Sequence, residues 1–343
     1  MKRRDFLRAM VLGTATATIP RGHNLSLASQ KNSGVLSALS GHIASLISPC
    51  NTAFGQAAPT GKIASPPQLS FRKEPHKDHK FLTFVSATFP DVPGCTCESW
   101  CYESELDFVD FRKLENGKLK LRHRVRSQPH VLIVTVATPQ PGAVELVARP
   151  VLDNRQNPKA HLPNQLPGLN MCFQLKKAET FRSQPDPYPE FVRRCFIFTE
   201  EGRTFLLQTN RRKILHRWPA EHRFNTPPWV QMYVGVWRPV PEVQGRGWAE
   251  YSTDRYTIPV IGAVSRDGQH LTAVANSSAS MMAQAWHDCL HNNPVWIPKD
   301  APPADRRWRV KVYVVPNDPQ SLLCQVAKDF PTALKLQEKR VPP

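Results

Sequence analysis

The sequence predicts an all-β protein, a large antiparallel β-sandwich with one short C-terminal helix. Proline accounts for 33 of the 343 residues, about twice its usual share of roughly 5%. Proline disfavours helices because it lacks an amide donor and clashes with the preceding turn. Short β-branched and aromatic runs recur along the chain with turn residues between them, as in sandwiches and barrels. The sequence shows neither a strand–helix alternation nor a glycine-rich phosphate loop.

Two hairpins are the clearest strand pairs. The β-branched run at residues 131–136 and the run at 143–149 flank a cluster of turn residues that ends at Gly142. The runs at 194–199 and 204–208 flank a second connection of hairpin length that contains Gly202. Four further strands are expected at residues 229–237, 256–264, 271–275 and 308–315.

One helix is predicted at residues 318–330. Asp318 is a good N-cap, Pro319 suits the first helical position, and the apolar residues that follow repeat with helical spacing. The stretch 278–291 also has apolar residues at helical spacing. It lies between predicted strands, however, which favours a strand that runs into a loop.

The N-terminus resembles a twin-arginine export signal. Arg3 and Arg4 are adjacent, Phe6 and Leu7 follow at positions of the motif, and a short apolar stretch lies directly behind them. That stretch is too short to cross a bilayer, so we expect a periplasmic or secreted protein without a transmembrane span. The expected organisation is a leader at 1–57, a linker at 58–78, a single β-sandwich domain at 79–335 and a tail at 336–343.

The excess of basic residues restricts the kinds of molecule that the protein is expected to bind. The chain has a formal net charge of +17, and the leader contains six basic residues against Asp5, so the rest of the chain keeps +12. The basic residues are scattered, without an arginine-rich tract or an aromatic-interleaved motif. We therefore expect an acidic or neutral polysaccharide as partner, and no nucleic acid.

The end of the chain resembles galactose-mutarotase-like supersandwich domains. The resemblance spans about residues 240–335 and depends on an aromatic-rich strand at 308–315, followed by Asn317-Asp318-Pro319 and a short helix. It implies a supersandwich-like fold and a role in processing sugars. The whole chain also resembles β-sandwich proteins that bacteria export through the twin-arginine route.

The densest polar cluster of the sequence lies at residues 286–296. His287 and His291 are candidate catalytic bases, since an imidazole near neutrality exchanges protons readily. An alternative is a divalent metal site made of His287, His291 and Asp288. A third interpretation is a hydrogen-bonded turn. The flanking residues expected to bind substrate are Trp286, Asn292, Asn293 and Trp296.

A second candidate cluster lies just before a predicted strand. Tyr251 and Arg255 are candidate catalytic groups, the tyrosine as a base and the arginine as the partner of a substrate carboxylate. Glu250 and Asp254 are expected to bind sugar hydroxyls. We expect this segment to lie near the histidine cluster at a concave surface. The alternative is an ion pair with aromatic packing.

Three cysteines, Cys95, Cys97 and Cys101, lie within seven residues. An oxidising compartment favours a disulfide, either Cys97–Cys101 or Cys95–Cys101, over a metal site. No cofactor is expected, apart from the divalent metal of the alternative above. The first expectation is an exported protein that binds or processes carbohydrate, above all an acidic polysaccharide, with a lyase-type reaction as one version. Two alternatives remain open: metal-assisted hydrolysis, and a non-catalytic envelope or binding role.

Overall fold

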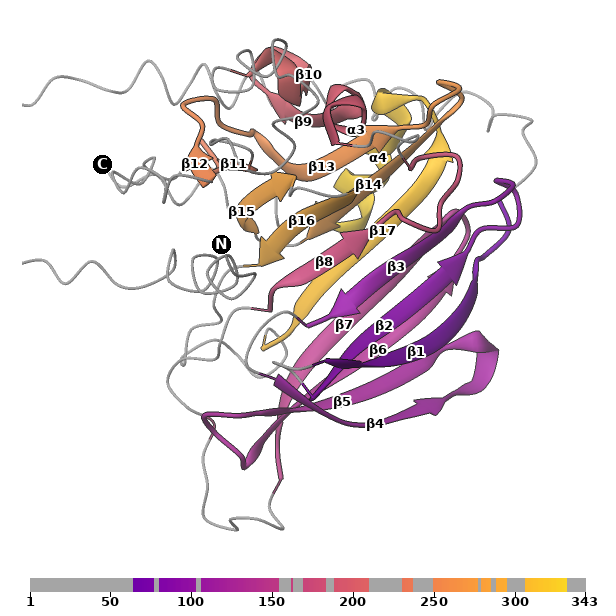
Figure 1. Cartoon of the computed structure of the whole chain (residues 1–343), viewed down its shortest axis with the longest axis vertical. Helices are drawn as coiled ribbons and strands as arrows, with labels where there is room; N and C mark the ends of the chain where they lie inside the picture. The colour runs from indigo at the N-terminus through magenta and orange to yellow at the C-terminus, as the bar shows by residue number, and fades with distance from the viewer. Residues whose placement is uncertain are drawn as a thin grey trace, which may run out of the picture.

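Two large sheets stacked face to face form the protein, with their strands running in nearly the same direction (Figure 1). The structure is a computed structural model that describes residues 64–76, 80–102, 106–153, 162, 169–182, 188–209, 230–236, 249–276, 279–284, 288–294 and 306–331. The predicted all-β sandwich is confirmed. The expected leader at 1–57 and tail at 336–343 lie outside the described residues.

The first sheet contains eight described strands. They are Gln68–His76 (β1), Lys80–Thr88 (β2), Thr96–Cys101 (β3), Met171–Gln174 (β8), Val230–Tyr233 (β11), Ala249–Tyr251 (β12), Ala279–Gln284 (β15) and Cys289–Pro294 (β16). Their order across the sheet is β1-β2-β3-β8-β16-β15-β11-β12. Only the β11–β12 pair in this order is parallel.

The second sheet contains nine described strands. They are Leu106–Lys113 (β4), Leu119–Val125 (β5), Val131–Gln140 (β6), Ala143–Leu152 (β7), Cys195–Thr199 (β9), Gly202–Phe205 (β10), Ile258–Val264 (β13), His270–Asn276 (β14) and Trp308–Pro316 (β17). Their order is β10-β9-β13-β14-β17-β7-β6-β5-β4, and every neighbouring pair is antiparallel.

Both predicted hairpins form. Strands β6 and β7 pair around Gly142, and β9 and β10 pair around Gly202. The two glycines have φ values of +63° and +90°, a left-handed conformation that side chains with a Cβ disfavour. The stretch 278–291, which was expected to be strand running into loop, contains β15 and the start of β16.

The predicted C-terminal helix is α4, at Pro319–Asp329. The Asp318 side chain accepts hydrogen bonds from the backbone N–H groups of Gln320 and Ser321, which satisfies donors that a helix start leaves open. A second short helix, α3 at Tyr188–Arg194, was not expected. The described residues also contain two single-turn 3-10 helices, η1 at Glu115–Gly117 and η2 at Leu206–Gln208.

Strand β1 lies inside the stretch that was expected to be a linker. Leu69 and Phe71 face the second sheet, and Phe71 stacks on Phe108 and Phe111 of β4 with ring centroids 5.3 Å and 4.2 Å apart. The other face of β1 is charged, which is common for an edge strand. The domain therefore begins at residue 68 or earlier rather than at residue 79.

Polar side chains fasten the two sheets together inside the apolar core. The Thr83 hydroxyl on β2 lies 3.0 Å from Nε2 of His123 on β5. The hydroxyl of Tyr102, which follows β3, lies 2.7 Å from that of Thr135 on β6. Such buried groups are tolerated because each finds a partner across the interface. In the part of the chain that the structure describes, no helix has the length and apolar character needed to cross a membrane.

Candidate functional site

A polar groove of about 860 Å³ lies at the β10 edge of the second sheet. One wall comes from the β9–β10 hairpin and η2, and the other comes from Val236 and the segment after β12. The lining residues are Thr199, Glu200, Glu201, Arg203, Thr204, Leu207, Gln208, Val236, Thr253, Asp254 and Arg255. Polar and charged groups therefore dominate the surface that a ligand would meet.

The β9–β10 turn presents two carboxylates to the groove. The Thr199 hydroxyl lies 2.7 Å from the Thr204 hydroxyl on the facing strand and accepts a hydrogen bond from the backbone N–H of Glu201 at 3.2 Å. These bonds hold the turn in a defined shape. Glu200 and Glu201 are exposed at its tip, so both carboxylates are available to a ligand.

Arg203 supplies a positive charge to the same wall. Its guanidinium donates to Oδ1 of Asn317 at 3.1 Å and lies 5.1 Å from the ring centroid of Phe205. Burial lowers the pKa of Arg203, yet an arginine remains protonated at neutral pH. The aromatic ring and the Asn317 amide position the guanidinium beside the groove.

The opposite wall contains two residues that the sequence singled out. Asp254 accepts a hydrogen bond from the Ser252 hydroxyl at 3.0 Å, and its backbone N–H donates to the Ser252 oxygen at 3.1 Å. Arg255 is exposed and donates to the backbone oxygen of Val236 at 3.2 Å. The groove thus combines three carboxylates with two guanidinium groups.

The histidine cluster lies elsewhere. His291, Asn292 and Asn293 belong to β16 and are 0%, 2% and 3% exposed. None of them lines the polar groove. The structure therefore does not bring His291 to Arg255, which is one of the pairings that the lyase-type hypothesis allowed.

Side chains alternate between the two faces of β16. Asn292 faces the second sheet, where its amide nitrogen donates to the backbone oxygens of Pro259 and Val274, both at 2.8 Å. Its side-chain oxygen accepts from the amide of Asn276 at 2.5 Å. Asn292 thus ties β16 to β13 and β14, while His291 and Asn293 lie on the outer face.

Tyr251 shares this outer face with His291. His291 lies opposite Ala283 on the next strand. Ala283 lies opposite Met232, and Met232 lies opposite Tyr251. Three strand spacings separate the two side chains by about 14 Å. They belong to one surface of the sheet without being in contact.

Several predicted site residues fall outside the description. Trp286, His287 and Trp296 lie outside the described residues, as does the side chain of Glu250. Asp288 is 8% exposed, and its backbone oxygen accepts a hydrogen bond from the Leu175 N–H at 2.8 Å.

The predicted disulfides Cys97–Cys101 and Cys95–Cys101 are wrong, since all three cysteines are free thiols. Cys97 and Cys101 are four residues apart on the extended strand β3, about 13 Å along the chain, which is far beyond disulfide reach. Cys95 lies close to Cys97 instead, with sulfurs 3.8 Å apart. Burial raises the pKa of the Cys101 thiol to about 12, so it is a poor nucleophile near neutral pH.

Sequence reasoning missed the β9–β10 half of the groove. The segment Glu200-Glu201-Gly202-Arg203 was identified only as a turn between strands. The three charged residues in these four positions were the feature of the sequence that could have indicated a binding site. The pairing of β9 with β13 places this turn beside the segment that contains Asp254, and that contact cannot be inferred from local sequence.

Comparisons with known proteins add little about function. No protein-family model and no curated protein matches the chain. Among solved structures, the chain is similar to the α-N-acetylgalactosaminidase NagBb from Bifidobacterium bifidum in complex with GalNAc. The TM-score is 0.39 and the identity 11%, over 79% of this chain and 39% of that one. The chain therefore spans about two fifths of the length of that enzyme.

Two further solved structures resemble the chain to a similarly low degree. The same enzyme in complex with Gal-NHAc-DNJ gives a TM-score of 0.37 and 10% identity, over 78% of this chain and 38% of that one. The Slr1438 protein from Synechocystis sp. PCC 6803 gives a TM-score of 0.31 and 9% identity, over 76% of this chain and 99% of that one. TM-scores of this size do not establish a shared fold, and nothing about activity follows from them.

Proposed function

We propose that the protein binds a saccharide in the polar groove at the β10 edge. The observation that carries the proposal is the composition of the groove. Three carboxylates, two guanidinium groups, three threonine hydroxyls and one amide face a volume of about 860 Å³. Carboxylates accept hydrogen bonds from sugar hydroxyls, guanidinium groups donate to them, and these charge-assisted bonds are stronger than neutral ones.

The balance of charge favours a neutral saccharide over an acidic one. Carboxylates outnumber guanidinium groups by three to two along the groove. A polyuronate would place its own carboxylates beside Glu200, Glu201 and Asp254, and like charges at short range repel. The basic excess of the whole chain is therefore not concentrated where the ligand would bind.

Replacing Glu201 and Arg255 together with glutamine should weaken saccharide binding about tenfold or more, because it removes charge-assisted bonds worth about 1.5–3 kcal/mol each. Isothermal titration calorimetry against a panel of neutral and uronate oligosaccharides measures this. The wild-type protein is expected to bind at least one neutral oligosaccharide and to prefer it over oligouronates.

The matched control is the double variant Arg112→Gln/Glu115→Gln. It removes the same charges from exposed positions at the β4 edge, the opposite edge of the same sheet. Its affinity should equal that of the wild type. Equal weakening in both double variants would show that the groove is not the binding site, and a wild-type protein that binds no saccharide would refute the proposed function.

We also propose that the protein reaches its ligand outside the cytoplasm, through the twin-arginine route. Replacing Arg3 and Arg4 with lysine should leave the protein in the cytoplasm, because the arginine pair is the recognised element of the signal. Cell fractionation followed by immunoblotting measures the distribution. Replacing Lys2 with arginine instead leaves the pair intact and should not affect export, whereas normal export of the double-lysine variant would contradict the proposal.

A further inference from the structure

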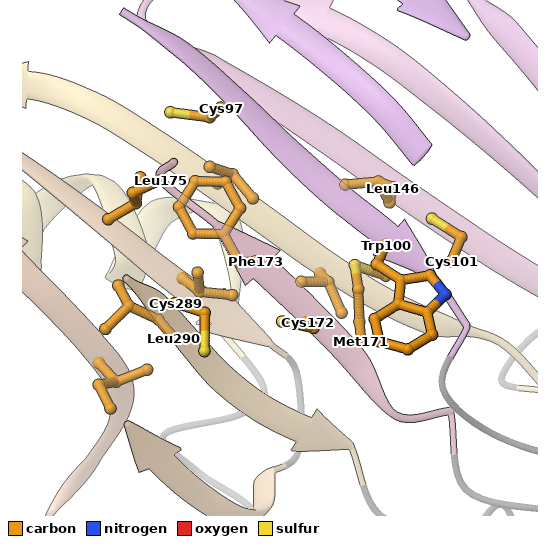
Figure 2. Close-up of a cluster of buried hydrophobic side chains, with 14 of the residues drawn as sticks. Cys97, Trp100, Cys101, Leu146, Met171, Cys172, Phe173, Leu175, Cys289 and Leu290 are labelled. Atoms are coloured by element: carbon orange, nitrogen blue, oxygen red, sulfur yellow. The ribbon is translucent and has the colours of Figure 1, made fainter. Parts of the chain in front are cut away.

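Two cysteines and a histidine converge in the middle of the first sheet. Figure 2 shows Cys172 on β8 and Cys289 on the neighbouring strand β16. His291 also belongs to β16. The two sulfur atoms and one imidazole nitrogen all lie within 4.8 Å of one another. All three side chains have 0% exposure. We call these three residues the Cys2His cluster.

The register of the strands explains the convergence. Cys172 is directly opposite His291 in the antiparallel pair, so both side chains are on the same face of the sheet. Cys289 precedes His291 by two positions, which puts it on that face as well. Sγ of Cys289 lies 3.3 Å from Nε2 of His291. The three ligand atoms thus form a compact triangle on two paired strands.

The same register makes a Cys172–Cys289 disulfide unfavourable. Cys289 is directly opposite Gln174, so Cys172 is its diagonal neighbour. Diagonal residues in an antiparallel pair are about 7–8 Å apart, whereas disulfides usually span Cα separations of about 4.4–6.8 Å. Neither cysteine forms a disulfide. They therefore remain available as ligands even in an oxidising compartment.

We propose that the Cys2His cluster binds a zinc ion. Thiolate sulfur and imidazole nitrogen are the ligands that zinc favours in proteins. Zinc binding displaces the protons of the two thiols to solvent. Two thiolates and a neutral imidazole then balance the charge of a divalent cation, so the buried site carries no net charge. This matters because an uncompensated charge in the protein interior is very costly.

This site differs from the metal site that the sequence suggested. It keeps His291 and replaces His287 and Asp288 with Cys172 and Cys289. Asp288 is not part of the group that could hold an ion among the described residues. The difference follows from strand geometry, in which residues two apart share a face of the sheet.

The position of the cluster suits a preformed metal site. β8 and β16 are the two central strands of the eight-stranded order, so each is paired on both sides. Trp100 of β3 lies directly opposite Cys172 and is 1% exposed, which shields the cluster on one side. Three protein ligands leave a fourth position of the zinc tetrahedron for another group.

The proposal is tested on the full-length protein produced in zinc-supplemented medium. Inductively coupled plasma mass spectrometry should find one zinc per chain. After chelation, titration with Co²⁺ should produce the intense near-ultraviolet absorption of thiolate-to-cobalt charge transfer. Titration of the chelated protein with Zn²⁺ in a weakly buffered indicator should release about two protons per ion and raise the melting temperature.

The variants Cys172→Ser and Cys289→Ser should each lose the zinc and the cobalt absorption. Cys101→Ser is the matched control, because Cys101 is another fully buried thiol of the same sheet, and it should retain both. Zinc that persists in both serine variants would overturn the proposal. If those variants fail to fold, the wild-type titration decides, since a wild-type chain without bound zinc, cobalt absorption or proton release also overturns it.

Discussion

Replacing Asn292 with alanine should lower the free energy of unfolding by about 3–5 kcal/mol. The substitution removes the amide that bonds the backbone oxygens of Pro259 and Val274 in the interior. The Asn276 amide loses its bond to Oδ1 of Asn292 but keeps the backbone oxygen of that residue at 3.1 Å. Each buried polar group without a partner costs about 1–3 kcal/mol. Urea unfolding monitored by circular dichroism measures the change.

Asn317→Ala is the control for this experiment. Asn317 is a half-buried asparagine that also donates to a backbone oxygen, that of Gly268 at 2.8 Å. Its loss also removes the bond that Oδ1 accepts from Arg203. The cost should still be less than about 1 kcal/mol, because solvent can replace both bonds. An Asn276→Ala/Asn292→Ala double variant should be less destabilised than the sum of the single variants, since the two amides bond to each other.

The same experiment decides the role of Asn292. The sequence indicated a substrate-binding residue, whereas the hydrogen bonds indicate a residue that fastens the two sheets. A variant with wild-type stability and lost saccharide binding would support the first role. A strongly destabilised variant supports the second.

The strands that the sequence predicted are those with buried, β-branched residues on both faces or with a marked turn beside them. β6, β7, β13 and β17 belong to the interior of the second sheet, so their sequences are apolar runs bounded by turns. β1 was missed because it is an edge strand, where Arg72-Lys73-Glu74-Pro75 obscures the two apolar residues that face the core. Charged residues and proline are favourable in an edge strand, but the same residues are also typical of linkers, so the sequence alone predicted a linker.

Only some residues of each candidate site could be predicted from the sequence, because the others come from strands that are distant in the chain. Asp254 and Arg255 stood out as charged residues next to aromatic ones, and both line the groove. Their partners Glu200 and Arg203 come from a hairpin far away in sequence. Likewise, His291 was singled out, but Cys172, which lies opposite it, was not. Local patterns identify single residues, whereas the pairing of distant strands determines which residues share a site.

His123 is the buried group whose titration should dominate the acid response of the fold. It is 1% exposed between the two sheets, with the rings of Tyr102 and Phe108 at centroid distances of 5.4 Å and 5.8 Å. Burial lowers its pKa from 6.5 to about 4, because the charged imidazolium is poorly solvated in this setting. Its Nδ1 has no hydrogen-bond partner among the described residues, so no acceptor stabilises the protonated ring from that side.

As the pH falls below 6.5, His123 takes up a proton in the unfolded chain but not in the folded protein until about pH 4. The unfolded state then binds more protons, so the protein should lose stability across this window, by about 2–3 kcal/mol between pH 7.5 and pH 4.5. His123→Leu cannot take up this proton, and Thr83 keeps the Cys101 carbonyl as a partner. Urea unfolding at both pH values measures the loss.

The wild type and the variant are compared by the difference between their free energies of unfolding. At pH 7.5, where the imidazole is neutral in both the folded and the unfolded state, this difference reports packing alone. At pH 4.5 that difference should shift by about 2–3 kcal/mol in favour of the variant, and an unchanged difference would show that His123 does not govern the acid response.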